Sequence, residues 1–425
     1  MSTGARAGEL RVLIVTDQYE PMVGGVPTVT RDLARGLAAR GHAVTVVAPS
    51  ATRRGRQDGG APGEVAVDFR GSVPWPWYEG QRLGVLPRAR AGELISAFAP
   101  DVVHLHSPLT LGAAASAAAR RRGVPVVYTN HYLPLNVWPA AALAADTARP
   151  AARARDAAFY ACVTGFANRC DLVTAPTATA LRLLREHGLR APSKTVSNGV
   201  DLGRFAPGRA DVALRSKYAL PPGRPLVLSV GRLSPEKRGD VLIAAIARLP
   251  RALGGAAADA DPVLVLAGTG PDEDRLRSLA RHHGVADLVR FPGFVDDEDL
   301  PGLYRLAEVF AIASQAELQS LVTMAAMASG LPVVAVDAGA LAELVHPGEN
   351  GFLARPGNAG EIAESLGLLC RDADLRARMS KASLRIIGGH DVHRLLGRWE
   401  SIYRALASPD TDGPCATVQP QNRRR

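Results

Sequence analysis

Short apolar runs alternate with helix-like patterns through the first half of the chain. Leu10–Val15, apolar apart from Arg11, is predicted to be a strand, and a helix is predicted after it. That helix places its apolar residues at helical spacing: Val26, Val29, Leu33 and Leu37. Further strands are predicted at residues 43–48, 102–105, 124–129 and 172–175. Buried strands separated by helices predict a parallel, doubly wound sheet.

The second half of the chain repeats this alternation. Strands are predicted at residues 226–230, 263–267, 289–291, 309–313 and 333–336, with helices between them. Two such sheets predict an α/β protein with two Rossmann-like domains that face each other and bind ligands at the carboxyl ends of the strands. The length of 425 residues also exceeds a single core and suits two domains of about 200 residues.

The pattern breaks near residues 205–218, where Pro207 and Gly208 interrupt it, and we place the crossing between domains there. The predicted organisation is a first domain over 1–205, a second over 206–390, a terminal helix over 391–407 that crosses back to the first domain, and a disordered basic tail over 408–425. Residues 51–63 are expected to form a flexible basic loop.

Composition narrows the class of protein. A hydrophobic content of 47% with 21% charged residues indicates a folded globular chain. The formal net charge of +9 suits anionic small molecules, an anionic membrane surface or nucleic acid, but no platform of interleaved basic and aromatic residues supports nucleic acid. The four cysteines lack metal-ligand spacing and are expected to be reduced: Cys162, Cys170, Cys370 and Cys415. Without a signal-like or membrane-spanning run, we expect a cytoplasmic protein, whose basic charge also fits peripheral membrane contact.

The segment 229–238 leaves a predicted strand and enters a helix. Ser234 is a candidate N-cap, with Pro235 at the first helical position. Arg232 and Lys237 flank this turn, and two converging cations can neutralise a diphosphate. A solvated charged loop is the alternative interpretation.

A second candidate site lies in the segment 316–335, which predicts an acidic loop, a helix and a buried strand. Glu317 and the backbone N–H groups around Ser320 and Leu321 meet at the helix N-terminus. Such a site suits a ligand with both phosphate and hydroxyl groups, because the helix end attracts the anion and the carboxylate accepts hydroxyl protons. A capped surface helix is the alternative.

The first domain offers weaker candidates. Gly24 and Gly25 follow its first strand and allow a ligand to approach the backbone, although they lack the G-x-G-x-x-G spacing of a dinucleotide site. His131 follows a strand and is expected to face the cleft, where it can hydrogen-bond a sugar hydroxyl or carry positive charge. A purely structural loop histidine is the alternative.

Metal chemistry finds little support in the sequence. The two Asp-x-Asp pairs, at 259–261 and 410–412, have no phosphate-facing context, and no Walker, H-E-x-x-H or G-x-S-x-G pattern is present. We therefore expect no metal and no cofactor, and the leaving group of any transfer reaction to be stabilised by cations and helix-end N–H groups.

Three segments together resemble the signatures of the family-4 glycosyltransferases, which have the GT-B fold, use nucleotide sugars and retain anomeric configuration. They are TNHYLP at 129–134, GRLSPEKRG at 231–239 and AELQSLVTMAAMASGLPVV at 316–334. The resemblance implies that Arg232 and Lys237 contact the diphosphate, and that His131 and Glu317 contact the donor sugar. It further implies a donor pocket near Gly24, Gly25, Asn198, Gly231, Gly270, Ser320, Leu321 and Ala325.

Two positions depart from the family pattern. Ala325 stands where the family has a second glutamate that binds the ribose hydroxyls, and Pro134 is followed by Leu135-Asn136 where relatives have Glu-Asn. A ribose without its carboxylate partner loses a charged hydrogen bond of about 1.5–3 kcal/mol. We expect an enzyme with an altered pocket.

The resemblance implies a retaining, metal-independent transferase that moves a hexosyl or N-acetylhexosaminyl group from a nucleotide sugar to a hydroxyl of a lipid or small polar acceptor. The most similar members are UDP-sugar-dependent and include diacylglycerol glucosyltransferase-like proteins. Two alternatives stay open. One is a UDP-N-acetylglucosamine-dependent transferase of aminoglycoside-type antibiotic biosynthesis. The other is a non-catalytic, glycosyltransferase-like partner protein, suggested by Ala325.

Overall fold

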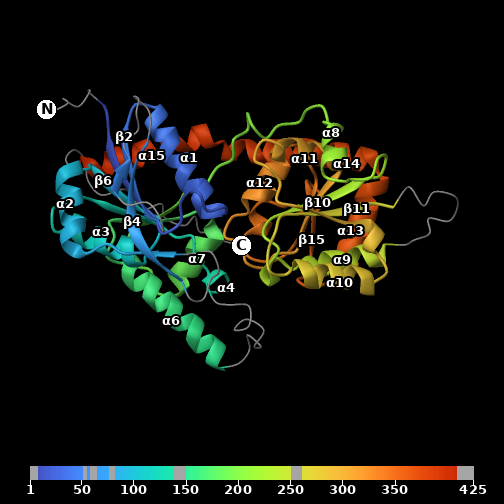
Figure 1. The fold of residues 1–425 in the computed structure, drawn as a ribbon, viewed down its shortest axis with the longest axis horizontal. Coiled ribbons are helices and arrows are strands. Elements are labelled where there is room, and N and C mark those ends of the chain that lie inside the picture. Colours follow the sequence, from blue (N-terminus) through green and yellow to red (C-terminus); the bar gives the residue numbers. More distant parts are fainter. Residues whose placement is uncertain are drawn as a thin grey trace, which may run out of the picture.

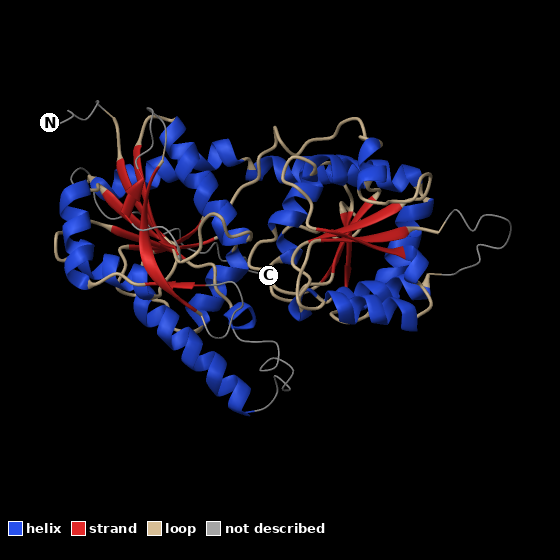
Figure 2. Ribbon diagram, in the orientation of Figure 1, coloured by secondary structure: helices blue, strands red, loops and turns tan. Residues whose placement is uncertain are grey.

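The computed structural model describes residues 8–50, 55–57, 65–75, 82–137, 150–249 and 261–408. The chain forms two lobes side by side, each built on a central sheet with helices on both faces (Figures 1 and 2). The predicted α/β class with two Rossmann-like sheets is confirmed.

The first sheet has the strand order β3-β4-β2-β1-β6-β7-β8-β9, and β5 pairs with β4. β3 and β5 run antiparallel to β4, whereas the remaining pairs are parallel. Its strands are β1 (Arg11–Val15), β2 (Ala43–Ser50), β3 (Gly55–Gln57), β4 (Ala66–Pro74), β5 (Arg82–Gly84), β6 (Val102–Leu105), β7 (Val126–Thr129), β8 (Leu172–Ala175) and β9 (Ser193–Thr195). Its helices are α1 (Gly25–Ala39), α2 (Arg88–Phe98), α3 (Thr110–Arg120), α4 (Pro134–Val137), α6 (Pro150–Ala167) and α7 (Ala178–Glu186).

The second sheet is parallel throughout, in the order β12-β11-β10-β13-β14-β15. Its strands are β10 (Leu226–Val230), β11 (Val263–Ala267), β12 (Val289–Gly293), β13 (Val309–Ile312), β14 (Val333–Val336) and β15 (Gly351–Ala354). α8 (Ala213–Lys217) precedes this sheet. The helices around it are α9 (Gly239–Arg248), α10 (Glu273–His282), α11 (Leu300–Leu306), α12 (Leu321–Ala328), α13 (Ala359–Arg371) and α14 (Ala373–Ile387).

Each sheet contains a point where the strand order reverses. In the first sheet β1 lies beside β6, and in the second β10 lies beside β13. The connections that leave the carboxyl ends of these neighbouring strands turn in opposite directions, which opens a crevice between them. The residues that follow β1, β6, β10 and β13 are therefore the ones that the topology places at ligand-binding edges.

The last helix, α15 (Val392–Ala407), runs back from the second lobe to the first (Figure 1). Four of its side chains join the core formed by α1 and the first sheet: Leu396, Trp399, Ile402 and Tyr403. Gly36 of α1 allows the close contact, because a Cβ atom there would lie 2.5 Å from the side chain of Leu396. The first lobe is thus completed by residues from the far end of the sequence.

Several strands were not predicted from the sequence. β3 lies inside the segment predicted to be a loop, and β4, β5, β9 and β15 were not predicted. β4 mixes apolar and charged residues with a glycine, and β9 is only Ser-Lys-Thr, so neither has a buried-strand pattern. The other predicted strands agree within about two residues. Residues 51–54, 58–63 and the predicted tail from 409 onward lie outside the described residues.

In the described part of the chain, no helix is long and apolar enough to cross a membrane.

The contribution of α15 to the first core can be measured with Leu396→Ala. Leu396 is 4% exposed, so its truncation leaves a cavity between α15 and α1. We expect the free energy of unfolding to fall by about 2–5 kcal/mol in urea unfolding followed by circular dichroism. Arg398→Ala, on the exposed face of the same helix, is the matched control and should change stability by less than about 0.5 kcal/mol. Equal losses in the two variants would contradict this packing.

Candidate functional site

The loop after β10 is held by close backbone contact with the loop after β11. Gly231 donates its N–H to the carbonyl of Ala267 at 2.9 Å, and Leu233 donates to the carbonyl of Thr269 at 2.9 Å. A Cβ atom on Gly268 would lie 2.0 Å from the carbonyl oxygen of Gly231, and one on Gly270 would lie 2.1 Å from that of Leu233. Gly268 and Gly270 therefore keep the two loops in register by having no side chain.

The predicted helix start after this loop is a short 3₁₀ turn, Pro235–Lys237, followed by α9. Ser234 precedes the turn, but its hydroxyl donates to the carboxylate of Glu236 at 2.5 Å instead of capping a backbone N–H. Ser234 therefore occupies the predicted N-cap position, with Pro235 first in the turn, but its side chain makes no capping hydrogen bond. Arg238 has a left-handed backbone, with φ of 53°, and forms the boundary between the turn and α9.

Lys237 and Glu317 meet where the strand order reverses. Lys237 follows β10 and Glu317 follows β13, and Lys237 Nζ donates to Glu317 Oε1 at 2.7 Å. The Glu317 carboxylate is 9% exposed, so the ion pair is shielded from water on one side. Together with Gly231 and Arg232, the two residues line a cavity of about 430 Å³, part of which is open to solvent. The crevice thus combines two cations with one carboxylate.

The helix N-terminus predicted beside this cavity is present. Ser320 caps α12, since its Oγ accepts the Thr323 N–H at 3.3 Å. Across the cleft, a Cβ atom on Gly25 would lie 3.9 Å from the side chain of Leu321, so the start of α1 faces the start of α12. Ala325 lies one turn further into α12, is 5% exposed, and is not among the residues that line the cavity.

The other predicted residues also lie outside the lining of this cavity: Gly24, Gly25, His131, Asn198, Gly270, Ser320 and Leu321. Gly24 is the N-cap residue of α1, and Gly270 supports the loop after β10 from behind. The structure therefore brings Gly231, Arg232, Lys237 and Glu317 into one cavity.

His131 follows β7 and is partly buried. Its Nε2 lies 2.9 Å from Nδ1 of His106, and the two rings are stacked with an interplanar angle of 9°. Burial lowers the pKa of His131 to about 4 and the pKa of His106 well below its ordinary value. At neutral pH both rings are uncharged, which disfavours the positively charged form of His131 considered from the sequence and leaves it a hydrogen-bonding role.

Sequence reasoning missed Gln319, which joins the loop of Glu317 to the first lobe. Its Oε1 accepts the N–H of Asn198 at 2.7 Å, and its Nε2 donates to the hydroxyl of Ser197 at 2.9 Å. Asn198 is thus held by backbone contact next to the Glu317 loop. A glutamine within an acidic loop gives no sequence signal for such a contact.

Glu343 was also missed, and it binds a helix of the opposite lobe. Its carboxylate accepts the N–H groups of Ala178 and Thr179 at 3.0 and 2.6 Å, at the N-terminus of α7. Thr177, the N-cap residue of that helix, donates its hydroxyl to the carbonyl of Leu318 at 2.7 Å. A carboxylate at a helix N-terminus satisfies free N–H groups and complements the helix dipole. These contacts fix the two lobes against each other beside the Glu317 loop.

Asp17 is the third residue that was missed, at the corresponding edge of the first sheet. It follows β1, is 2% exposed, and accepts hydrogen bonds from the Ser107 hydroxyl at 2.5 Å and the Gly84 N–H at 3.3 Å. Ser107 follows β6, so this contact spans the reversal point of the first sheet. Burial raises the pKa of Asp17 to about 6 despite both hydrogen bonds.

Comparison with known proteins agrees with this geometry. Residues 23–204 match the family described as Glycosyltransferase Family 4, and residues 212–385 match Glycosyl transferases group 1. The chain is 32% identical over 274 residues to a GDP-mannose-dependent alpha-mannosyltransferase of Mycolicibacterium smegmatis, covering 64% of this chain and 66% of that protein. It is 27% identical over 308 residues to alpha-monoglucosyldiacylglycerol synthase of Streptococcus pneumoniae, covering 70% and 65%.

Solved structures show the same fold. A sucrose-phosphate synthase from Thermosynechococcus elongatus has a TM-score of 0.74 at 20% identity, covering 94% of this chain and all of that one. The Anabaena protein HepE, solved in complex with UDP-glucose, has a TM-score of 0.72 at 22% identity, covering 93% of this chain and all of that one. The fold is therefore that of the GT-B glycosyltransferases.

With one family match over each lobe, the chain belongs to the family-4 glycosyltransferases. The aligned regions span just under two thirds of the length of the curated relatives, 66% and 65% for the two described above.

The backbone contact behind the loop after β10 can be tested with Gly270→Ala. The added Cβ would lie 2.1 Å from the Leu233 carbonyl oxygen, so one of the two loops must shift. We expect a loss of about 1–3 kcal/mol in the free energy of unfolding, measured by chemical denaturation. Gly389→Ala is the control, because no described atom lies within 4 Å of its added Cβ. A variant of Gly270 as stable as the wild type would show that the contact is not tight.

The raised pKa of Asp17 predicts a pH-dependent stability. The carboxyl has a pKa of about 6 when folded against 3.8 for the ordinary value, so the folded state binds the proton more tightly. Stability contributed by the protonated form is complete below about pH 4 and is lost as the pH rises to about 6. The free energy of unfolding of the wild type relative to Asp17→Asn should therefore rise by up to about 3 kcal/mol between pH 7 and pH 4. A difference that is constant over this range would contradict the raised pKa.

Proposed function

We propose that the protein is a retaining, metal-independent glycosyltransferase that moves a hexosyl or N-acetylhexosaminyl group from a nucleotide diphosphate sugar to an acceptor hydroxyl. The observation that carries the proposal is the meeting of Arg232, Lys237 and Glu317 at the reversal point of the second sheet. Two cations beside a carboxylate suit a ligand in which a diphosphate adjoins a sugar with free hydroxyls.

The cations would act on the leaving group. As the bond between the anomeric carbon and the phosphate oxygen breaks, negative charge grows on the diphosphate. Arg232 and Lys237 would stabilise that charge, with the first N–H groups of α12 nearby. Lys237 would then lie between Glu317 and the phosphate, so the ion pair of 2.7 Å pre-positions the cation before the donor binds.

The acceptor would react on the face that the diphosphate leaves. The acceptor oxygen forms the new bond to the anomeric carbon, and its proton moves to the departing phosphate oxygen, so retention needs no separate base. Glu317 would accept hydrogen bonds from the sugar hydroxyls, while neutral His131 would donate or accept one from the first lobe. Holding the sugar from both sides favours this geometry.

Ala325 defines how the donor pocket differs from the family pattern. Position 325 lies outside the lining of the cavity that holds Lys237 and Glu317, and its methyl side chain offers the ribose no hydrogen bond. Donor binding would then be weaker by about 1.5–3 kcal/mol than with a charged hydrogen bond to the ribose. The sugar and diphosphate contacts would supply most of the affinity.

The nucleobase of the donor and the chemical class of the acceptor are the finer parts of the proposal. The resemblance of the HYLP and AELQSLVT segments favours a UDP-linked sugar and a lipid acceptor, and the name of the pneumococcal relative agrees with a diacylglycerol acceptor. The mycobacterial relative is named for GDP-mannose, which makes GDP-mannose the second candidate donor. The net charge of +9 would assist docking at an anionic membrane surface.

Calorimetric titration tests the proposal with UDP, GDP, UDP-glucose, UDP-N-acetylglucosamine and GDP-mannose. We expect one nucleotide to bind, its sugar conjugate to bind more tightly, and Arg232→Ala to weaken both by roughly 10- to 150-fold. Arg248→Ala, a charge change on α9 outside the cavity lining, is the matched control.

Ala325→Glu separates the enzyme from the non-catalytic alternative. In an enzyme with an altered pocket, wild type binds donor and the variant binds it more tightly. If only Ala325→Glu binds the donor, the result favours the non-catalytic, glycosyltransferase-like partner protein. If neither protein binds any of these nucleotides or nucleotide sugars, although circular dichroism shows that both are folded, the glycosyltransferase proposal is rejected.

A further inference from the structure

His106 is the histidine in contact with His131. His106 follows β6 at the reversal edge of the first sheet and is 1% exposed. Its Nδ1 lies 2.9 Å from Nε2 of His131, within a stack whose ring centroids are 5.2 Å apart. This nitrogen-to-nitrogen contact is a hydrogen bond only if one of the two atoms carries a proton and the other does not.

Because both rings are neutral, their tautomers are coupled. If His106 carries its proton on Nδ1, it donates to His131, whose own proton must then be on Nδ1. If His131 carries its proton on Nε2, it donates to His106, whose proton must then be on Nε2. His131 therefore has an N–H at Nδ1 in the first arrangement and a bare nitrogen there in the second.

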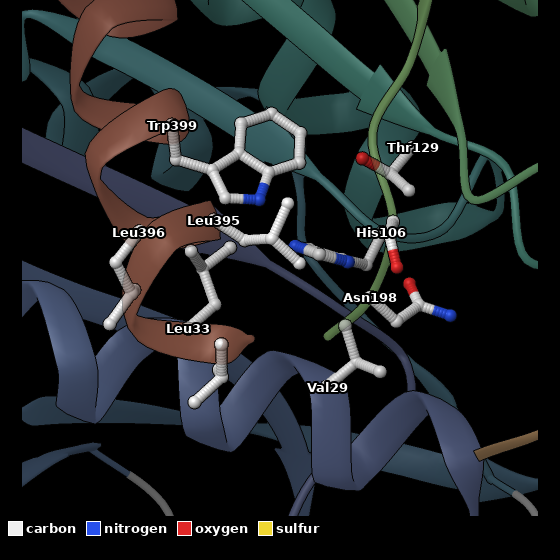
Figure 3. Close-up of a pocket in the computed structure, with 10 residues that line it drawn as sticks. Val29, Leu33, His106, Thr129, Asn198, Leu395, Leu396 and Trp399 are labelled. Atoms are coloured by element: carbon white, nitrogen blue, oxygen red, sulfur yellow. The ribbon is translucent and has the colours of Figure 1, made fainter. Parts of the chain in front are cut away.

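The surroundings of His106 Nε2 distinguish the two arrangements. This atom is buried and has no hydrogen-bond partner among the described residues. It belongs to a pocket of about 360 Å³ between α1 and α15, and much of the lining is apolar: Val29, Leu33, Leu395, Leu396 and Trp399. Figure 3 shows the imidazole of His106 directed at Leu395, with the indole nitrogen of Trp399 facing the same pocket.

A proton on His106 Nε2 would place an unpaired N–H in this pocket. Orphaned buried N–H groups are rarer than under-satisfied acceptors. The indole nitrogen of Trp399 is itself a donor only, so a second N–H would face a like dipole, whereas a bare nitrogen would face an opposite one. Both arguments put the proton of His106 on Nδ1.

Neighbouring residues hold His106 in this orientation. The ring of His104 lies 4.2 Å from that of His106, and both nitrogens of His104 are engaged, with the Tyr403 hydroxyl at 2.7 Å and the Thr129 hydroxyl at 2.7 Å. Tyr403 and Trp399 both belong to α15, and the Trp399 ring lies 4.7 Å from that of His104. Helix α15 thus contacts His104, which in turn packs against His106, the partner of His131.

We propose that His106 is a positioning residue that fixes His131 as the tautomer with its proton on Nδ1, so that His131 offers the donor sugar a hydrogen-bond donor. Nδ1 of His131 makes no hydrogen bond to a described residue, and the side chain is only partly buried, so this N–H is available to a ligand. The identity of that ligand as a sugar hydroxyl rests on the proposed function. The tautomer itself does not.

The first test is ¹⁵N NMR of the histidine side chains in the ligand-free protein, with His131 assigned by its loss in His131→Asn. We expect wild type to show a single neutral tautomer of His131, protonated at Nδ1. His106→Leu removes the partner, and His106→Asn supplies one that can either donate or accept, so both variants should show the Nε2-protonated form as well. His283→Asn, at an exposed histidine, should leave His131 unchanged. Wild-type His131 protonated at Nε2, or a single tautomer retained in His106→Asn, would overturn the proposal.

The second test compares nucleotide sugar with free nucleotide by calorimetry. If His131 donates to the sugar, both His106 variants should lose roughly threefold to tenfold in affinity for the nucleotide sugar and keep wild-type affinity for the nucleotide alone. If His106 only supports His131 by packing, His106→Asn should keep wild-type affinity for the nucleotide sugar. That result would contradict the proposal. If the wild type binds no nucleotide at all, the proposed function fails while the NMR result still decides the tautomer.

Discussion

The second lobe depends on backbone contacts that leave no room for a side chain. Gly268 and Gly270 pack against the carbonyls of Gly231 and Leu233, which fixes the loop after β10 relative to the sheet. Only with that loop fixed do Arg232 and Lys237 point into the crevice, and only there does Lys237 reach Glu317 at 2.7 Å. A cation already oriented by a neighbouring carboxylate needs little reorganisation when an anion arrives, which is the condition for strong electrostatic stabilisation.

The same crevice is shaped from the first lobe. The loop that carries Glu317 is bonded on its next residues to Thr177, Ser197 and Asn198, while Glu343 occupies the N-terminus of α7. A change in the angle between the lobes would therefore strain the loop that carries Glu317, whether or not a ligand is bound. The cavity of the second lobe is therefore tied to the first lobe through the loop that carries Glu317.

The sequence predicted what depends on local pattern. The buried strands β11, β13 and β14 are continuous apolar runs, and β1, β6, β8 and β10 are apolar except at one position each. The loops after β10 and β13 contain charged residues close to a serine that precedes a helical turn. It could not predict strands such as β9, whose Ser-Lys-Thr carries no pattern because pairing with β8 alone defines it. Contacts between distant segments were equally invisible: Asp17 with Ser107, Gln319 with Ser197, and Glu343 with α7. Each is a single polar residue whose partner is chosen by tertiary structure. At Ser234 the missed contact is local, since the hydroxyl donates a hydrogen bond to the neighbouring Glu236 carboxylate.

The path of α15 has a consequence for how the protein comes to be folded. The core of the first lobe includes Leu396, Trp399, Ile402 and Tyr403, so the lobe that is synthesised first lacks part of its interior until the end of α15 has left the ribosome. During that interval the apolar face of α1 around Leu33 and Leu37 is uncovered, and His104 lacks the Tyr403 hydroxyl. The second lobe has no such dependence, because its core is drawn from residues between Val200 and Ile387. The order of synthesis and the order of completion are therefore opposite, and the first half of the chain is the part that most needs protection as it emerges.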